Sequence, residues 1–249
     1  MDIEELSIGL EKPPHLTLEG AALFLDLDGT LAPIVERPQD VGPDPRRSGL
    51  LERLAERLHG RLAVVSGRSL DDIDRILEGK VMCVAAIHGL IRRDARGVVG
   101  EAPPHPGIAP ARSALNDFAS SDPRLIIEDK ALSLTIHYRL APDRAREAIS
   151  LAERLATVTG LTLQPGDMVM ELRTPGASKG DSIRAFMTEA PFKGARPVFL
   201  GDDLTDEHGF FAVRQLGGHG VLVGPQRRTT AIYRMENVEA ALSWLEAAR

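Results

Sequence analysis

The segment Ala21-Ala22-Leu23-Phe24-Leu25-Asp26-Leu27-Asp28-Gly29-Thr30 decides the fold of this chain. Its uninterrupted apolar start, stopped by a glycine turn, is typical of a buried strand in a parallel sheet. Side chains two residues apart on an extended segment project to the same side, so Asp26 and Asp28 are expected to lie side by side. They follow the carboxyl end of the predicted strand, where open α/β sheets bind their ligands.

The two carboxylates indicate a particular chemistry. Neighbouring like charges are unfavourable unless a cation or a proton holds them together. The pair therefore suits Mg²⁺-assisted phosphoryl transfer, in which one carboxylate is the nucleophile and its neighbour the acid/base. A surface Asp-Gly turn is the weaker interpretation, because the acids directly follow a buried run. An EF-hand loop is excluded, because Thr30 and Leu31 stand where that loop needs an Asp or Asn and a Gly.

Size and composition narrow the class of protein. A chain of 249 residues suits one large domain or a core with a modest insertion. With 43% hydrophobic and 27% charged residues, the chain is expected to be globular. A net charge of −6 argues against nucleic acid or an anionic membrane as the main partner. The single cysteine, Cys83, excludes an intrachain disulfide and is interpreted as a small core residue.

The chain carries no recognisable targeting signal. Its start, Met1-Asp2-Ile3-Glu4-Glu5, lacks the basic and apolar regions of a signal peptide. No uninterrupted apolar stretch of the sequence is long enough to cross a bilayer. A soluble, cytoplasmic protein is therefore expected.

The order of predicted elements in the first half indicates a mostly parallel sheet with covering helices. The elements expected there are strands at 22–26, 61–66 and 81–88, helices at 48–58 and 69–77, and a hairpin at 92–99. After the linker-like Pro103-Pro104-His105-Pro106-Gly107, the pattern changes. Helices at 109–119 and 141–157 and strands at 124–128, 131–139, 161–164 and 168–173 are expected there. In the second strand of this segment Ser133, Thr135 and His137 alternate with apolar residues, which predicts a sheet with one solvated face.

The parallel pattern resumes near Thr174 with helices at 178–187, 204–215 and 238–248 and strands at 197–201 and 220–223. The predicted fold class is therefore α/β, a Rossmann-like parallel-sheet core with an inserted α+β unit that contains an antiparallel sheet. The predicted domains are a discontinuous core, 1–104 with 174–249, and an insert at 105–173.

Three further motifs lie where they could complete a phosphate site. Ser66-Gly67-Arg68 follows the second predicted strand, and a hydroxyl with backbone N–H groups at such a point can hold a phosphate oxygen. Lys179 begins a helix after a glycine-containing loop, and a Walker A loop is excluded because its pattern is absent. Gly201-Asp202-Asp203 is a second acidic cluster at the end of a strand. Asp26 and Asp202 would supply the one or two carboxylates that Mg²⁺ typically takes.

Other acids and polar groups have simpler interpretations. Asp206 and Glu207 open a helix, and Asp206 is expected to be mainly structural, behind the groups that touch the ion. In the insert, Glu128, Lys130 and Glu171 would by default be solvated, but they become partners for sugar hydroxyls if the insert closes over the acids.

Together these residues resemble the haloacid-dehalogenase superfamily of phosphotransferases. Asp26-Leu27-Asp28-Gly29-Thr30 matches its first motif, Ser66 its second, Lys179 its third and Gly201-Asp202-Asp203-x-x-Asp206 its fourth. Within that superfamily, the chain is similar over nearly its full length to the trehalose-6-phosphate phosphatase family. The specific matches are Ile87-His88-Gly89, Glu128-x-Lys130, His137-Tyr138-Arg139, Val169-x-Glu171-Leu172-Arg173, Gly176-x-Ser178-Lys179-Gly180 and Gly201-Asp202-Asp203-Leu204-Thr205-Asp206-Glu207.

The resemblance implies roles for these residues. Asp26 would form an aspartyl-phosphate, and Asp28 would protonate the leaving sugar oxygen and then activate water. The Mg²⁺ cofactor would bind Asp26, the main-chain carbonyl of Asp28, and Asp202, with Asp203 and Asp206 behind them. The resemblance further implies a set of residues that bind the phosphate end of the substrate: Thr30, Ser66, Arg68, His88 and Lys179. It also implies that Glu128, Lys130 and Glu171 bind the distal glucose. The implied partner is a small-molecule sugar phosphate, bound by a monomer or a weak homo-oligomer.

Alternatives remain open at this point. The same chemistry could act on another substrate, such as sucrose 6-phosphate or a mannosyl phosphate. A non-catalytic sensor is less favoured because the four motifs are intact. A mutase is also compatible with the first motif, since the two acids support transfer as well as hydrolysis.

Overall fold

The computed structural model describes residues 9–249, so the expectation about the chain start at 1–5 lies outside the described residues. The chain forms two compact units. The first, called the core unit, combines the chain up to Gly100 with Ala177–Arg249, and the second, called the insert unit, is Glu101–Gly176. These boundaries differ by a few residues from those predicted at 104/105 and 173/174.

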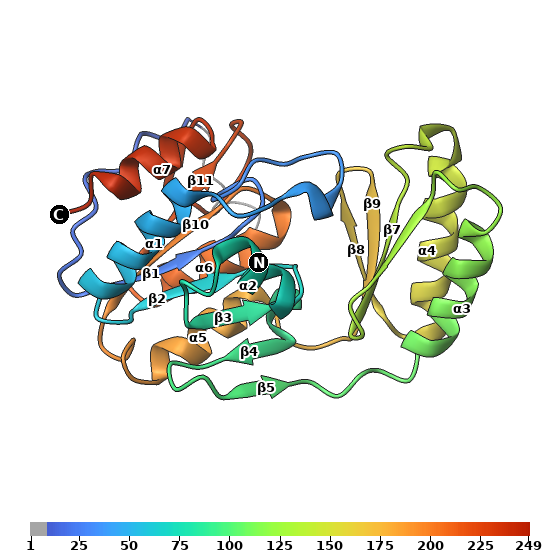
Figure 1. The fold of residues 1–249 in the computed structure, drawn as a ribbon, viewed down its shortest axis with the longest axis horizontal. Helices are drawn as coiled ribbons and strands as arrows, with labels where there is room; N and C mark the ends of the chain where they lie inside the picture. Colours follow the sequence, from blue (N-terminus) through green and yellow to red (C-terminus); the bar gives the residue numbers. More distant parts are fainter. Residues whose placement is uncertain (1–8) are drawn as a thin grey trace. The chain divides into compact units, whose positions relative to one another are not determined.

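Over the described part of the chain, the core unit is built on an eight-stranded sheet with the order β12-β11-β10-β1-β2-β3-β4-β5 (Figure 1). The strands from β12 to β3 pair in parallel, and β4 pairs antiparallel with β3. The α/β prediction with a parallel sheet is therefore confirmed. The strands are β1 Ala21–Leu25, β2 Leu62–Val65, β3 Cys83–Ala86, β4 Ile91–Arg93, β5 Val99–Glu101, β10 Arg196–Gly201, β11 His219–Val223 and β12 Tyr233–Met235.

Helices cover this sheet, and local sequence fixes where they begin. The α-helices are α1 Pro45–Arg57, α2 Leu70–Leu77, α5 Lys179–Thr188, α6 Glu207–Gln215 and α7 Val238–Glu246, and the short 3-10 helices are η2 Pro38–Asp40, η3 Ile87–Gly89 and η5 Leu204–Asp206. Ser178 and Asp181 form a reciprocal capping box, so α5 starts at Lys179. This start places the lysine in the first helical turn.

One face of the core sheet is packed with aromatic rings. Phe24 and Phe199 lie on the neighbouring strands β1 and β10, opposite each other in the register. Phe186 of α5 and Phe210 of α6 pack onto them, and these four side chains are at most 1% exposed. Full burial of such a side chain contributes roughly 1.5–3 kcal/mol, so this layer holds β1, β10 and the two helices in fixed positions.

The insert unit has a separate antiparallel sheet with the order β6-β7-β9-β8 within the described residues. Its elements are α3 Ile108–Ala119, β6 Ile126–Asp129, β7 Ser133–His137, η4 Pro142–Arg144, α4 Ala145–Thr159, β8 Thr162–Gly166 and β9 Val169–Arg173. An apolar cluster that includes Leu115, Leu134, Ile136, Leu151 and Leu172 joins α3 and α4 to one face of this sheet. The unit thus has a hydrophobic core of its own.

The prediction of a solvated opposite face on β7 is wrong. Ser133 is fully buried and Thr135 is only 4% exposed, although both alternate with the apolar residues as expected. Thr135 lies between Glu128 on β6 and Glu171 on β9 in the strand register. The longer side chains of Glu128 and Glu171 on the neighbouring strands therefore cover Thr135.

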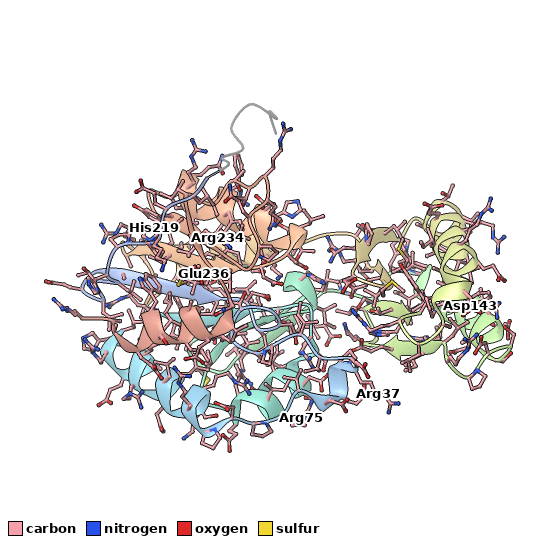
Figure 2. All side chains as sticks on the ribbon, turned by 90° about the horizontal axis from the view of Figure 1, so that it is seen from above. Arg37, Arg75, Asp143, His219, Arg234 and Glu236 are labelled. Atoms are coloured by element: carbon pink, nitrogen blue, oxygen red, sulfur yellow. The ribbon has the colours of Figure 1, made fainter. Side chains whose placement is uncertain are left out.

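Two details of the core unit also differ from the sequence prediction. The third strand ends at Ala86, because Ile87, His88 and Gly89 all adopt positive φ angles that leave the extended conformation. The edge strand β12 was not predicted, because three residues give too short a pattern. His219 of β11 and Arg234 of β12 are labelled in this part of the core unit in Figure 2.

Among the described residues, no helix has the length and apolar character needed to span a bilayer.

Candidate active site

The acidic motifs meet because their strands are neighbours. Strands β1 and β10 pair in parallel with Leu25 opposite Leu200, and the N–H of Asp26 donates to the carbonyl of Leu200 at 2.9 Å. Asp26 follows β1 and Asp202 follows β10, so both lie at the carboxyl edge of the sheet. This is the edge at which the sequence predicted a ligand site.

Three carboxylates form one cluster at this edge. Asp26, Asp202 and Asp206 each offer an oxygen, and these oxygens lie within 4.8 Å of one another. Asp26 is 4% exposed and Asp206 is completely buried. Lys179 reaches the cluster from the first turn of α5, and its Nζ donates to Asp26 Oδ1 at 2.9 Å and to Asp206 Oδ1 at 2.7 Å. Residues from three distant stretches of the chain are therefore brought together.

Burial dominates the electrostatics of this cluster. Desolvation raises the pKa of Asp26 to about 8, with further increases from Asp202 and Asp203 and a decrease from Lys179. Burial, together with the charges of Asp206 and Asp203, raises the pKa of Asp202 to about 7. Although desolvation opposes it, the Asp206 and Asp26 carboxylates raise the pKa of Lys179 well above its ordinary value. Lys179 therefore stays charged, and one lysine does not neutralise the surrounding acids.

Asp206 organises the loop that carries Asp202. Its Oδ2 accepts hydrogen bonds from the backbone N–H groups of Asp202 at 2.9 Å and Asp203 at 3.0 Å. Its other oxygen holds Lys179. Asp203 in turn caps η5 by accepting from the N–H groups of Thr205 and Asp206. Both side chains thus bind protein groups in this loop.

Gly29 allows the first and fourth motifs to approach closely. A Cβ atom at this position would lie 2.1 Å from Asp202 Oδ2 and 2.3 Å from its Cγ. The residue also has a φ angle of +77°, which favours glycine. The glycine in the first motif is therefore required by the position of an acid from the fourth.

Asp28 lies beside the cluster in a different environment. Its two oxygens accept from Arg68 Nε at 2.6 Å and from Arg68 Nη2 at 2.7 Å, a bidentate pair. Arg68 Nη1 donates to the carbonyl of Pro38 at 2.8 Å. The side chain of Asp28 is about one-third exposed, whereas that of Arg68 is buried. The arginine predicted at the phosphate thus contacts the predicted acid/base.

Two hydroxyls lie buried near these acids in the predicted phosphate motifs. Thr30 is fully buried and its Oγ1 has no hydrogen-bond partner among residues 9–249, while Ser66 Oγ accepts from the N–H of Arg68 at 3.2 Å. A buried hydroxyl without a partner is unfavourable by about 1–3 kcal/mol, which favours an unseen acceptor such as a phosphate oxygen.

His88 packs against the turn that carries Ser66. A Cβ at Gly67 would lie 2.6 Å from His88 Nε2, and the N–H of His88 donates to the carbonyl of Ser66 at 2.9 Å. Ile87 and His88 have φ angles of 47° and 56°, which are strained for residues with a side chain. This strained turn supports the Ser66-Gly67-Arg68 loop, a contact that the sequence pattern did not predict.

The insert unit has a second charged cluster on the polar face of its sheet. Lys130 Nζ lies 3.5 Å from Glu128 Oε1 and 3.9 Å from Glu171 Oε1. His137 Nε2 lies 3.0 Å from Glu128 Oε2. The three residues predicted to bind a sugar are therefore neighbours within the insert unit.

The residues of the core cluster fit a hard divalent cation. Hard cations such as Mg²⁺ prefer carboxylate, carbonyl and water oxygens. Asp26 and Asp202 offer such oxygens, whereas both oxygens of Asp206 already bind Lys179 and the backbone. Burial, with a smaller contribution from neighbouring carboxylates, raises the pKa values of Asp26 and Asp202 and so disfavours their charged forms. A cation between them would favour those charged forms.

The fold and this site together define a haloacid-dehalogenase-type phosphatase. The fold agrees with solved structures. A trehalose-6-phosphate phosphatase related protein is 28% identical, with a TM-score of 0.75 over 90% of this chain and 95% of that chain. The C-terminal domain of trehalose-6-phosphate phosphatase from C. albicans has the same fold, with a TM-score of 0.83 over 96% of this chain and 97% of that chain at 21% identity.

Sequence relatives give the family. The model of the trehalose-phosphatase family matches residues 24–238. The trehalose-6-phosphate phosphatase of Escherichia coli (strain K12) is 40% identical over 95% of this chain and 89% of the relative. The probable trehalose-phosphate phosphatase of Sinorhizobium fredii (strain NBRC 101917 / NGR234) is 39% identical over 84% and 79%, respectively. The chain belongs to the trehalose-phosphatase family and is a phosphatase.

Proposed function

We propose that this protein hydrolyses trehalose 6-phosphate to trehalose and phosphate. The observation that carries the proposal is the buried Lys179, held between Asp26 and Asp206 next to Asp202. Such a set of groups suits phosphoryl transfer, where positioning and charge stabilisation supply most of the catalysis. The family membership and the names of its relatives support the choice of substrate.

Asp26 is the proposed nucleophile. One of its oxygens forms a bond to phosphorus while the bond from phosphorus to the sugar oxygen breaks, and the product is an aspartyl-phosphate. Lys179, Thr30 and Ser66 hold the oxygens of the transferring phosphoryl group. Water then attacks phosphorus, which releases phosphate and restores the Asp26 carboxylate.

Asp28 is the proposed acid/base. It donates a proton to the leaving sugar oxygen and later accepts one from the attacking water, so its protonation state is the same after a full cycle. Arg68 holds both Asp28 oxygens in this structure. Because both oxygens accept hydrogen bonds from this arginine, Asp28 must turn away from Arg68 before it can donate a proton to the substrate.

Asp26, Asp202 and the main-chain carbonyl of Asp28 are the proposed ligands of Mg²⁺. When bound, Mg²⁺ would neutralise charge on the phosphoryl oxygens and help to orient the group for attack. Asp203 and Asp206 support this site through the loop contacts described above.

We propose that the insert unit supplies substrate specificity. Glu128, Lys130 and Glu171 offer two acceptor groups and one donor group on the polar face of its sheet. Such a combination suits sugar hydroxyls, which both donate and accept hydrogen bonds. The insert would thereby act as the substrate-specificity cap of the enzyme.

Phosphate release from a panel of sugar phosphates tests the function. Trehalose 6-phosphate, sucrose 6-phosphate and a mannosyl phosphate are compared, with Mg²⁺ and with excess chelator. Fast release is expected only from trehalose 6-phosphate with Mg²⁺. The Asp26→Asn variant is expected to lose activity by a factor of about 10⁴ or more, because the nucleophile is removed.

Each other outcome identifies a different function. Faster turnover of another sugar phosphate would replace the substrate but keep the chemistry. Transfer of the phosphoryl group to a second position of the sugar would identify a mutase. Tight binding of trehalose 6-phosphate without any release, in wild type and Asp26→Asn alike, would identify a sensor.

A further inference from the structure

Arg227 contacts the backbone of the Asp202-Asp203 segment. It lies after β11, the strand next to β10, with Leu222 opposite Gly201 in the parallel register. Its Nη2 donates to the carbonyl oxygens of Asp203 at 2.6 Å and Asp202 at 3.3 Å. An arginine far along the chain therefore binds the two peptide groups that follow β10.

Glu207 holds this arginine in place. Arg227 Nη1 donates to Glu207 Oε1. Glu207 Oε2 accepts from both the N–H and the hydroxyl of Thr230, each at 2.8 Å. The side chains of Arg227 and Glu207 are 23% and 11% exposed, so solvent screens the ion pair only partly. These hydrogen bonds connect the loop after β11, the start of α6 and the loop after β10.

We propose that Arg227, held by Glu207, is a positioning residue for the divalent-cation site. It fixes the two carbonyl groups of the Asp202-Asp203 segment while Asp206 fixes the N–H groups of the same two residues. The backbone from which the Asp202 side chain extends is thus held from both sides. This inference rests on the proposed role of Asp202 as a cation ligand.

Its contacts distinguish Arg227 from a substrate-binding arginine. Both terminal nitrogens donate to acceptors of the protein itself, and the planar fork fits two acceptors at once. A lysine would offer a single point charge and could not bridge Glu207 and the carbonyls in the same way. Groups that orient metal ligands typically change metal affinity about 10–100-fold when they are removed.

Direct binding of Mn²⁺, followed by the electron paramagnetic resonance of the free ion, tests the proposal without an activity assay. Arg227→Ala is expected to raise the Mn²⁺ dissociation constant about 10–100-fold. Arg227→Lys is expected to lie between this variant and wild type. The matched control is Arg228→Ala, because Arg228 is the exposed neighbour, and it is expected to bind as wild type does.

Two further measurements separate the possible results. Asp202→Asn is expected to abolish Mn²⁺ binding at this site. If the wild-type protein binds no Mn²⁺, or if Asp202→Asn binds it as well as wild type does, the proposed function is contradicted instead. Millimolar guanidinium is expected to restore part of the affinity in Arg227→Ala, whereas a merely unfolded protein would not recover. Wild-type affinity in Arg227→Ala overturns the inference. If that variant does not fold by circular dichroism, wild-type affinity in Arg227→Lys overturns it.

Discussion

The core unit and the insert unit each contain a lysine between two carboxylates, but the two arrangements differ. Lys179 makes short hydrogen bonds of 2.9 and 2.7 Å to Asp26 and Asp206. Lys130 lies 3.5 and 3.9 Å from Glu128 and Glu171, beyond the usual length of a hydrogen bond. The first trio is almost fully buried, whereas the Glu128 side chain is 28% exposed.

The difference suggests how the two clusters are used. Short bonds among buried charges fix the positions of the groups before substrate binds, as transition-state stabilisation requires. Longer contacts, with Glu128 partly exposed, leave the side chains of the insert cluster room to adjust to a ligand. We therefore expect changes in the core cluster to affect stability and the chemical step, and changes in the insert cluster to affect substrate binding.

The largest effect is expected for Asp206→Asn. This change removes a negative charge from beside the fully buried Lys179 and replaces one of the oxygens that bind Lys179 and the backbone. Removal of one partner from a buried ion pair destabilises a protein by about 3–5 kcal/mol. Urea unfolding followed by the fluorescence of Trp244, the single tryptophan and a residue of the core unit, measures this loss.

The matched variant in the insert is Glu128→Gln, which also removes one partner of a lysine. Because Glu128 is partly exposed, the expected destabilisation is below about 1 kcal/mol. Its unfolding is followed by far-ultraviolet circular dichroism, since the tryptophan lies in the other unit. Equal losses of stability in the two variants would remove the proposed difference between the clusters.

The sequence predicted the meeting of Asp26, Asp202 and Lys179 because simple rules apply to them. Parallel strands place their carboxyl ends at one edge, and a capping box places the lysine in the first turn of its helix. The rules could not predict Arg227, whose contacts depend on a loop with no motif of its own. Nor could they predict that Arg68 binds Asp28, because that pairing depends on the side-chain conformations of both residues.

The errors in the fold have similar causes. Alternation along β7 correctly placed Ser133 and Thr135 on the polar face, but burial depends on neighbouring strands that the alternation does not describe. The third strand ends early because three consecutive residues with positive φ angles follow it, and a β-branched residue such as Ile87 rarely adopts that conformation. Local patterns therefore predicted element types and order better than they predicted side-chain surroundings.

The second-largest effect is expected for the Lys130→Met variant of the insert unit. Loss of a charged partner for the sugar is expected to raise KM for trehalose 6-phosphate by about 10–100-fold, while kcat changes by less than about tenfold. Steady-state kinetics at saturating Mg²⁺ measure both constants. The matched control is Lys193→Met, which changes an exposed lysine of the core unit and is expected to leave both constants unchanged. A loss confined to kcat would assign Lys130 to the chemical step instead.

The last expected effect is the pH dependence of metal binding by the core cluster. Burial raises the pKa values of Asp26 and Asp202 to about 8 and about 7, so these acids hold protons near neutral pH when no cation is bound. A cation must displace those protons, and its affinity therefore rises with pH by about tenfold per unit for each proton displaced. The rise should end near pH 8, above which both acids are ionised in the metal-free protein.

Mn²⁺ dissociation constants measured from pH 6 to 9 test this dependence. In Asp26→Asn the acid with the higher pKa is gone, so weaker binding with a plateau that begins nearer pH 7 is expected. The insert provides the contrast, because burial of Glu128 is outweighed by His137 and Lys130, which lower its pKa and keep it ionised. Glu128→Gln should therefore leave the pH profile of metal binding unchanged. A constant affinity for Mn²⁺ across this range in wild type would mean that the core acids are already ionised in the metal-free protein, which would contradict the raised pKa values of Asp26 and Asp202.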